Sequence, residues 1–224
     1  VMALTLHKGM TKAVIRDAKI PTADFAVVHA VNDLKDINLP YPLFVKPVAE
    51  GTGKGITGKS VIENDLQLEQ MTDHLLKTFK QPVLVEKFLS GREFTVGVIG
   101  TDTEARSIGL MEVVLKQNAE KNVYSYFNKE EYETVVEYAL VEGEIAEACK
   151  KVAVDSWRTL GCQDGGRVDL RCDEHGIPNF IEVNPLAGLH PVNSDLPILC
   201  RMNGISYEEL ISMIMKSAVK KIKK

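Results

Sequence analysis

The chain has 224 residues, of which 45% are hydrophobic and 26% are charged, as in folded proteins and unlike disordered segments. Its formal net charge of −4 gives a nucleic-acid partner no broad electrostatic support. No apolar run is long enough to span a membrane, and no secretory signal is present. The chain carries four widely spaced cysteines without a C-x-x-C pattern, which predicts reduced thiols in a cytoplasmic protein. Because the sequence opens in mid-pattern, we expect a piece of a longer chain.

The first part of the chain predicts a helix and two strands. Apolar spacing predicts a helix over residues 5–18, and strands are expected over residues 25–28 and 43–46. The side chains on the inner side of this helix are predicted to be Leu6, Met10, Val14 and Ile15. Phe44 and Lys46 point the same way along the second strand. A lysine in a strand that looks buried raises the question of what it pairs with, since lysine is rarely buried unpaired.

A glycine-rich segment follows, with glycines at positions 51, 53 and 55. Glycines let backbone N–H groups approach a phosphate closely. Residues 53–60 also fit the P-loop pattern G-x-x-x-x-G-K-[ST], but a P-loop requires Lys59-Ser60 to open a helix. Val61-Ile62 instead continues extended, and the next helix begins after Asn64, a good N-cap. We therefore interpret Gly58-Lys59 as a turn between strands, with the P-loop as the alternative.

The middle of the chain predicts a helix over residues 65–80 and then a buried strand over residues 82–85 that runs into residues 86–89. The helix carries its core residues at helical spacing, namely Leu68, Met71, Leu75 and Phe79. Ser90-Gly91 turns the chain, and Glu86 and Glu93 flank that turn. Further strands are expected over residues 94–99 and 108–115.

Residues 116–138 are polar and weakly periodic, and a connection of this length is usually a functional loop or lid. Lys129 lies within it and is equally explained as a surface lysine. A helix over residues 142–160 should end at Gly161. Residues 185–197 are rich in turn formers, and a capping box should start a final helix over residues 207–220.

Residues 165–184 predict a β-hairpin with its turn at 173–176. With Cys172 facing Asn179, strand periodicity places four polar side chains on one face of the sheet. The pairs across that face are Asp169 with Glu182 and Arg167 with Asn184. Two carboxylates and an amide oxygen suit a hard cation such as magnesium. The alternative is a solvated face with an ordinary cross-strand salt bridge.

Six segments, in order, resemble the D-alanine–D-alanine ligase family of ATP-grasp enzymes. They are LTLHKGMTK, VKPVAEGTGKGI, VLVEKFLSGREFTV, YSYFNKE, TLGCQDGGRVDL and FIEVNPLAGL. The resemblance implies an α+β ATP-grasp fold, in which two α+β lobes clamp ATP between antiparallel sheets. Residues 1–93 would form the central lobe with the glycine-rich phosphate loop. Residues 94–224 would form the C-terminal lobe with the metal-binding hairpin and the lid loop, and the family's amino-terminal domain would be absent.

The resemblance implies an ATP site in the first lobe and at the hinge. Lys8 and Lys46 would contact the phosphates, with Phe44 beside Lys46 in the nucleotide site, and Glu93 would bind the ribose. The phosphate-covering loop would be Gly51, Thr52 and Gly53. The hinge that hydrogen-bonds adenine would be Glu86, Lys87, Phe88 and Leu89.

The resemblance also implies the chemical groups of the second lobe. Lys129 would close on the phosphates, and Arg167 with the N–H of Gly188 would form an oxyanion site. Ser194 would receive the second substrate's carboxylate. Two Mg²⁺ ions, or Mn²⁺ in their place, would be held by Asp169, Glu182 and Asn184.

These groups predict an ATP-dependent ligase that joins two small amino acids, with D-alanine as the expected substrate, through an acyl phosphate, for peptidoglycan synthesis. The expected partners are small amino acids and a second copy of the chain in a homodimer, with no nucleic acid and no membrane. Departures from the family pattern lie at Thr52-Gly53, at Glu130 and after Asn184, where the segment is longer. His190 in that segment would contact substrate or lie at the surface. The alternatives are a ligase for other amino acids or peptides, and a nucleotide-binding module without catalysis.

Overall fold

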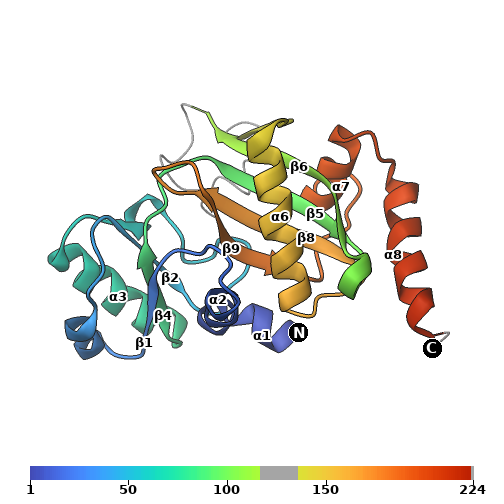
Figure 1. Cartoon of the computed structure of the whole chain (residues 1–224). Helices are drawn as coiled ribbons and strands as arrows, with labels where there is room; N and C mark the ends of the chain where they lie inside the picture. The colour runs from blue at the N-terminus through green and yellow to red at the C-terminus, as the bar shows by residue number, and fades with distance from the viewer. Residues whose placement is uncertain (117–135, 223–224) are drawn as a thin grey trace.

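Two antiparallel sheets form the framework of the computed structural model, which describes residues 1–116 and 136–222 (Figure 1). The first sheet has the order β1-β4-β2-β3 and the second the order β7-β6-β5-β8-β9. The strands of the first sheet are β1 Phe25–Val28, β2 Leu43–Pro47, β3 Val61–Ile62 and β4 Val83–Lys87. Those of the second are β5 Glu93–Ile99, β6 Arg106–Leu115, β7 Val136–Ala139, β8 Gly165–Cys172 and β9 Pro178–Asn184.

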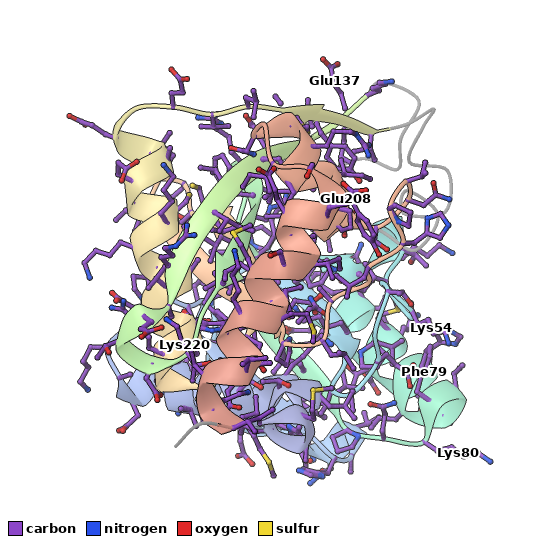
Figure 2. All side chains as sticks on the ribbon, turned by 90° about the vertical axis from the view of Figure 1, so that its right-hand side faces the viewer. Lys54, Phe79, Lys80, Glu137, Glu208 and Lys220 are labelled. Atoms are coloured by element: carbon purple, nitrogen blue, oxygen red, sulfur yellow. The ribbon has the colours of Figure 1, made fainter. Side chains whose placement is uncertain are left out.

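Helices cover both sheets. The α-helices of the described residues are α1 Met2–Leu6, α2 Lys8–Asp17, α3 Asp65–Phe79, α6 Glu144–Thr159, α7 Asp195–Met202 and α8 Tyr207–Ile222. Short 3₁₀ turns occur at η1 Val31–Asp36, η2 Gly58–Ser60 and η3 Asp102–Glu104. Helix α3 packs on the first sheet, whereas α6 and α7 pack on the second in two separate hydrophobic clusters. Helix α8 runs along one side of the molecule, with Glu208 near its start and Lys220 near its end (Figure 2).

The predicted helix over residues 5–18 is wrong in its continuity and, at Leu6 and Met10, in its inner side, whereas Val14 packs against the hydrophobic core as predicted. His7 is extended, with φ −86° and ψ 91°, and separates α1 from α2. Its side chain accepts a hydrogen bond from the N–H of Met10 at 3.1 Å and so caps α2. The separate axis of α2 turns Lys8 and Lys12 inward, and leaves Leu6 and Met10 more than half exposed. The predicted burial of Ile15 is confirmed.

The predicted helix signals of the middle and end of the chain are confirmed. The Asn64 side chain accepts a hydrogen bond from the N–H of Gln67 at 3.0 Å at the start of α3. Ser206 and Glu209 exchange side-chain and backbone hydrogen bonds ahead of α8, which is a capping box. Gly161 follows the end of α6 with φ 66°, a left-handed conformation that glycine adopts readily.

Three sequence-based boundaries are corrected. Residues 136–138, predicted as loop, begin strand β7, and strand β6 begins at Arg106, two residues before the predicted start at residue 108. Residues 195–197, predicted as irregular, open helix α7. Pro197 is compatible with that helix because the first turn does not need its N–H group. The rest of the predicted lid, with Lys129, lies outside the described residues.

The hairpin of β8 and β9 contains a β-bulge that the sequence-based register lacks. Next to the turn, Cys172 pairs with Pro178, not with Asn179 as predicted. A register shift between Asp169 and Leu170 then restores the predicted pairs of Asp169 with Glu182 and of Arg167 with Asn184. A bulge places an additional residue on one strand, and Ile181 therefore lines the same pocket as its neighbour Glu182.

The two sheets lie side by side, and the chain passes from one to the other between β4 and β5 (Figure 1). Helix α2 contacts both α6 and β9, and Ile15 belongs to the hydrophobic cluster of the second sheet. The start of the chain thus packs against the second sheet, and the division into 1–93 and 94–224 stays a prediction. Within the described residues, no helix combines the length and apolar character needed to cross a membrane.

The close packing of β8 against β9 and α6 can be tested by a substitution at Gly166. A Cβ at this position would lie 2.3 Å from the carbonyl oxygen of Asn184 and 2.8 Å from the Trp157 ring. We expect Gly166→Ala to lower the free energy of unfolding by about 1–3 kcal/mol, because overpacking forces backbone shifts. The control is Gly51→Ala, where no atom lies within 4 Å. Urea denaturation of both variants measures the effect, and equal stabilities would contradict the packing described here.

Candidate functional site

A pocket lies between the two sheets and receives side chains from both. Lys46 and Glu86 enter it from the first sheet, and Arg167, Asp169 and Glu182 from the second. The pocket brings together most of the site residues predicted from the sequence, namely Lys8, Phe44, Lys46, Gly53, Glu86, Lys87, Phe88, Leu89, Glu93, Arg167, Asp169 and Glu182. The predicted residues that do not line it are Gly51, Thr52, Asn184, Gly188 and Ser194. Lys129 falls outside the described residues, and the roles of all these residues stay predictions.

One end of the pocket is apolar and aromatic. The rings of Phe44 and Phe88 are stacked, with centroids 6.3 Å apart and an interplanar angle of 28°. Arg171 lies over the Phe88 ring at 5.0 Å, and Leu89 and Ile181 complete the lining here. Flat apolar surfaces with a cation above them suit an aromatic ring of a ligand. This end could hold a nucleobase.

Beside the aromatic end, the Glu86 carboxylate lies between two buried ammonium groups. Lys46 Nζ lies 2.6 Å from Oε1, and Lys12 Nζ lies 2.8 Å from Oε2. None of the three residues is more than 3% exposed. Burial raises the pKa of Glu86, but the charges of Lys12 and Lys46 outweigh it and lower this pKa to about 2. The carboxylate is therefore ionised at neutral pH.

The pocket wall of the second sheet centres on Arg167. Its guanidinium donates hydrogen bonds to the Asp169 carboxylate and lies 3.4 Å from Oδ2 of Asp195. Burial lowers the pKa of Arg167, but Asp169, Asp195 and Glu182 raise it above its usual value. The Thr95 hydroxyl donates to Oδ1 of Asp169 at 3.0 Å from the neighbouring strand β5. A permanently charged guanidinium is thus held at the pocket edge.

Lys8 joins the glycine-rich segment to the hairpin. Its ammonium donates to the backbone carbonyl of Glu50 and lies 3.4 Å from Oε2 of Glu182. The Glu50 side chain accepts a hydrogen bond from Gln81 at 2.7 Å, which anchors the segment to the first sheet. Lys8 therefore places a positive charge where the segment and the carboxylates meet.

The glycine-rich segment has the backbone that its sequence predicts. Gly53 and Gly55 have φ 73° and 79°, and a Cβ at Gly55 would lie 2.6 Å from the Pro47 ring. Residues 58–60 form one 3₁₀ turn that runs directly into strand β3, and Lys59 is exposed. The P-loop alternative is wrong, because Lys59 and Ser60 do not open an α-helix.

The facing carboxylates fit a divalent cation by their chemistry. Asp169 and Glu182 are directly paired across the hairpin, and the Asn184 amide lies 3.4 Å from Oδ2 of Asp169. Lys8 and Arg167 neutralise these carboxylates in the structure. The described residues contain no cluster of three His, Cys, Asp or Glu that could hold a metal. A metal here would therefore use the two carboxylates with the amide or with ligand oxygens.

The loop after β9 lies beside Arg167. A Cβ on Gly188 would be 2.7 Å from Oγ of Ser194, so these two residues are neighbours. The Ser194 hydroxyl accepts a hydrogen bond from the N–H of His190 at 3.0 Å, and Asp195, which follows it, contacts Arg167. The loop places Gly188 and Ser194 near the guanidinium but outside the pocket lining.

Sequence analysis missed Lys12, Thr95 and Arg171. Lys12 follows Lys8 by one helical turn, and two lysines at i and i+4 repel each other unless both have partners. The i, i+4 spacing of Lys8 and Lys12 could therefore have indicated that Lys12 has an acidic partner. Thr95 pairs with Asp169 across β5 and β8, but no local sequence pattern predicts which strands pair.

Comparisons with known proteins identify the class of fold. The chain is similar to an ATP-complexed D-alanine–D-alanine ligase of Bacillus anthracis, with a TM-score of 0.75, 22% identity, and coverage of 98% of this chain and 68% of the other. It is similar to the VanG D-Ala:D-Ser ligase of Enterococcus faecalis, with a TM-score of 0.78, 24% identity, and coverage of 96% and 62%. These likenesses confirm the predicted ATP-grasp fold.

The family follows from the sequence comparisons. Residues 14–216 match the family model of the D-Ala–D-Ala ligase C-terminus. The chain is 33% identical to a D-alanine–D-alanine ligase of Bordetella avium, over 99% of this chain and 68% of that protein. It is 31% identical to one of Ralstonia nicotianae, over 96% and 64%. The chain belongs to the D-alanine–D-alanine ligase family and spans about two thirds of the length of these relatives.

Glu86→Gln tests the buried charge cluster. Removing the negative charge leaves two ammonium groups uncompensated, and we expect a loss of about 3–5 kcal/mol of unfolding free energy at pH 7. Because the folded-state pKa of about 2 lies below the ordinary value of 4.5, this stabilisation is present above pH 4.5 and disappears as the pH falls towards 2. The difference between wild type and variant should therefore shrink over that range.

The measurement is denaturant unfolding of both proteins between pH 2 and pH 7. Glu174→Gln is the control, because it removes a carboxylate that pairs with Lys87 at the surface, where ion pairs contribute little. A pH-independent difference for Glu86→Gln would contradict the ion-paired state of this carboxylate.

Proposed function

We propose that the pocket binds ATP and that the protein uses it to join two small amino acids. The observation that carries this proposal is the composition of one pocket. It combines an aromatic end, buried cations from the first sheet and facing carboxylates from the second. These are the groups required by a base, a polyphosphate and a phosphate-bound cation. Membership of the D-alanine–D-alanine ligase family supports the same function.

The reaction has two steps. A carboxylate is a poor acyl donor because its oxygen is a poor leaving group, so its oxygen first attacks the γ-phosphorus of ATP and releases ADP. The amine of the second substrate then attacks the acyl phosphate, loses a proton and expels phosphate to form the amide bond. Lys8 and Lys46 would bind the charged phosphate oxygens, as phosphoryl transfer requires.

The tetrahedral oxyanion of the second step needs donors outside the phosphate site. Arg167, whose charge is permanent, and the N–H of Gly188 would bind it, and one such donor typically contributes about 2.7–4 kcal/mol. Ser194 would bind the carboxylate of the second substrate, and Lys129 would approach the phosphates. We include Gly51 and Thr52 as the cover of the phosphates.

Two magnesium ions, or manganese, would be held by Asp169, Glu182 and Asn184. When bound, such ions neutralise phosphate charge and act as Lewis acids. In their presence Lys8 and Arg167 would exchange their carboxylate partners for oxygens of the substrates. The protein itself would thus supply two cationic side chains, Lys8 and Arg167, whose present carboxylate partners can be replaced by a ligand.

The substrate assigned is D-alanine, with a dipeptide for peptidoglycan synthesis as the product, made in the cytoplasm by a protein that pairs as a homodimer. The departure after Asn184 lies in the segment that carries Gly188 and Ser194, on the substrate side, and favours, as a second candidate, a ligase for other amino acids or peptides. Screening D- and L-amino acids for phosphate release separates the two.

Lys46→Met tests the ATP site. The ammonium of Lys46 is buried at the pocket, and we expect its loss to weaken ATP binding by at least about tenfold, since hydrogen bonds to charged groups contribute about 1.5–3 kcal/mol. Lys59→Met is the matched control, because Lys59 is the exposed lysine of the rejected P-loop pattern. Calorimetric titration with Mg-ATP measures both. A large effect of Lys59→Met alone would contradict the site.

Asp169→Asn tests the ligase reaction in the full-length protein. The wild type should release ADP only when a suitable amino acid is added. The variant should lose at least about a hundredfold in kcat, because groups that stabilise transition-state charge typically contribute this much. Asp155→Asn, on the outer side of α6 and paired with Lys151, is the control. ATP binding without amino-acid-dependent turnover would instead support a nucleotide-binding module.

A further inference from the structure

Lys12 is the largest charged side chain that is completely buried in the described residues. It does not line the pocket, so it cannot contact a ligand there. Burial lowers the pKa of Lys12, and Glu86 partly offsets this effect. A buried ammonium is destabilising unless it is paired, and packing alone would be better served by an apolar side chain.

Lys12 connects the two sheets through hydrogen bonds and one ion pair. Its ammonium donates to the Thr22 hydroxyl at 2.7 Å, and that hydroxyl donates to the backbone carbonyl of Phe180 in β9 at 2.9 Å. On the other side the ammonium lies 2.8 Å from the Glu86 carboxylate in β4. The hydrogen bonds through Thr22 therefore hold the Lys12 ammonium to the second sheet, and its ion pair with Glu86 links it to the first sheet.

The consequence concerns the charge of Lys46. Glu86 carries one negative charge, and its two oxygens are divided between two ammonium groups. The trio as a whole therefore has one positive charge in excess. Its members Lys46 and Glu86 line the pocket, whereas Lys12 lies behind them, where the charge of Asp24 also acts on it. Without Lys12, the Glu86 carboxylate and Lys46 would form a neutral pair, with both carboxylate oxygens free to hold Lys46.

We propose that Lys12 is a positioning residue of the nucleotide pocket. By pairing with one oxygen of Glu86, Lys12 keeps the ammonium of Lys46 available to the phosphates of a nucleoside triphosphate. This inference rests on the proposed ATP site and assigns the source of its positive charge. Lys12 acts through Glu86 and Lys46 and touches no ligand itself.

The test compares ligands that differ only in phosphate charge. Lys12→Met replaces the ammonium by an apolar group of similar length. We expect its affinity for Mg-ATP to fall by about tenfold or more, because a charge-assisted interaction is lost. Its affinity for adenosine, which has no phosphate, should stay within about twofold of the wild type, since the aromatic end is unchanged. Calorimetry of the 224-residue chain with ATP, AMP and adenosine measures this series.

Thr22 supplies a second variant that leaves every charge in place. Thr22→Val removes the hydroxyl that holds Lys12, whereas Thr22→Ser retains it. We expect Thr22→Val to weaken ATP binding by about threefold or more, in line with the loss of one hydrogen bond, and Thr22→Ser to bind as the wild type does. This pair decides the question if Lys12→Met fails to fold.

Three results would overturn the inference. The first is a folded Lys12→Met variant that binds ATP as the wild type does. The second is an equal loss of ATP and adenosine affinity, which would make Lys12 a purely structural residue. The third is equal ATP affinity of the two Thr22 variants. If the wild type itself binds no ATP, the proposed function fails and this inference fails with it, so the wild-type titration distinguishes the two failures.

Discussion

The ion pair that Glu86 shares between Lys12 and Lys46 is the interaction on which the site depends. It lies where α2, β2 and β4 meet, and all three residues are almost completely removed from water. Ionised groups are placed in such an environment only at a large cost in desolvation, which mutual attraction must offset. These three side chains therefore fix the relative positions of α2, β2 and β4, and they place the positive charge of Lys46 at a defined point of the pocket.

The second sheet supplies the opposite charge by a different device. In β8 and β9 the carboxylates lie on neighbouring strands, and the bulge on β9 turns Ile181 and Glu182 towards the same pocket. A regular strand would direct these two side chains to opposite faces. The bulge thus places an apolar side chain next to a carboxylate in the lining of one pocket. Arg167 and Lys8 form ion pairs with these carboxylates.

Local sequence patterns predicted the elements well where the signal was itself local. Asn64 and the Ser206–Glu209 pair predicted helix starts because capping involves residues within one turn. The errors have equally local causes, since the extended His7 divides one apolar pattern into two helices. Because the bulge adds a residue to β9, the strand pairing next to the turn was displaced by one position.

Sequence alone singled out Lys46, Asp169 and Glu182 from residue type and strand periodicity, and Glu86 from the resemblance to the family. Only the tertiary structure decided which of them touch. Lys12 became a partner of Glu86 because α2 packs against both β9 and β1, and Arg167 met Asp195 because α7, which packs on β5 and β6, begins within reach of its guanidinium. Contacts between residues far apart in the chain depend on the packing of whole elements, and no local pattern encodes that packing.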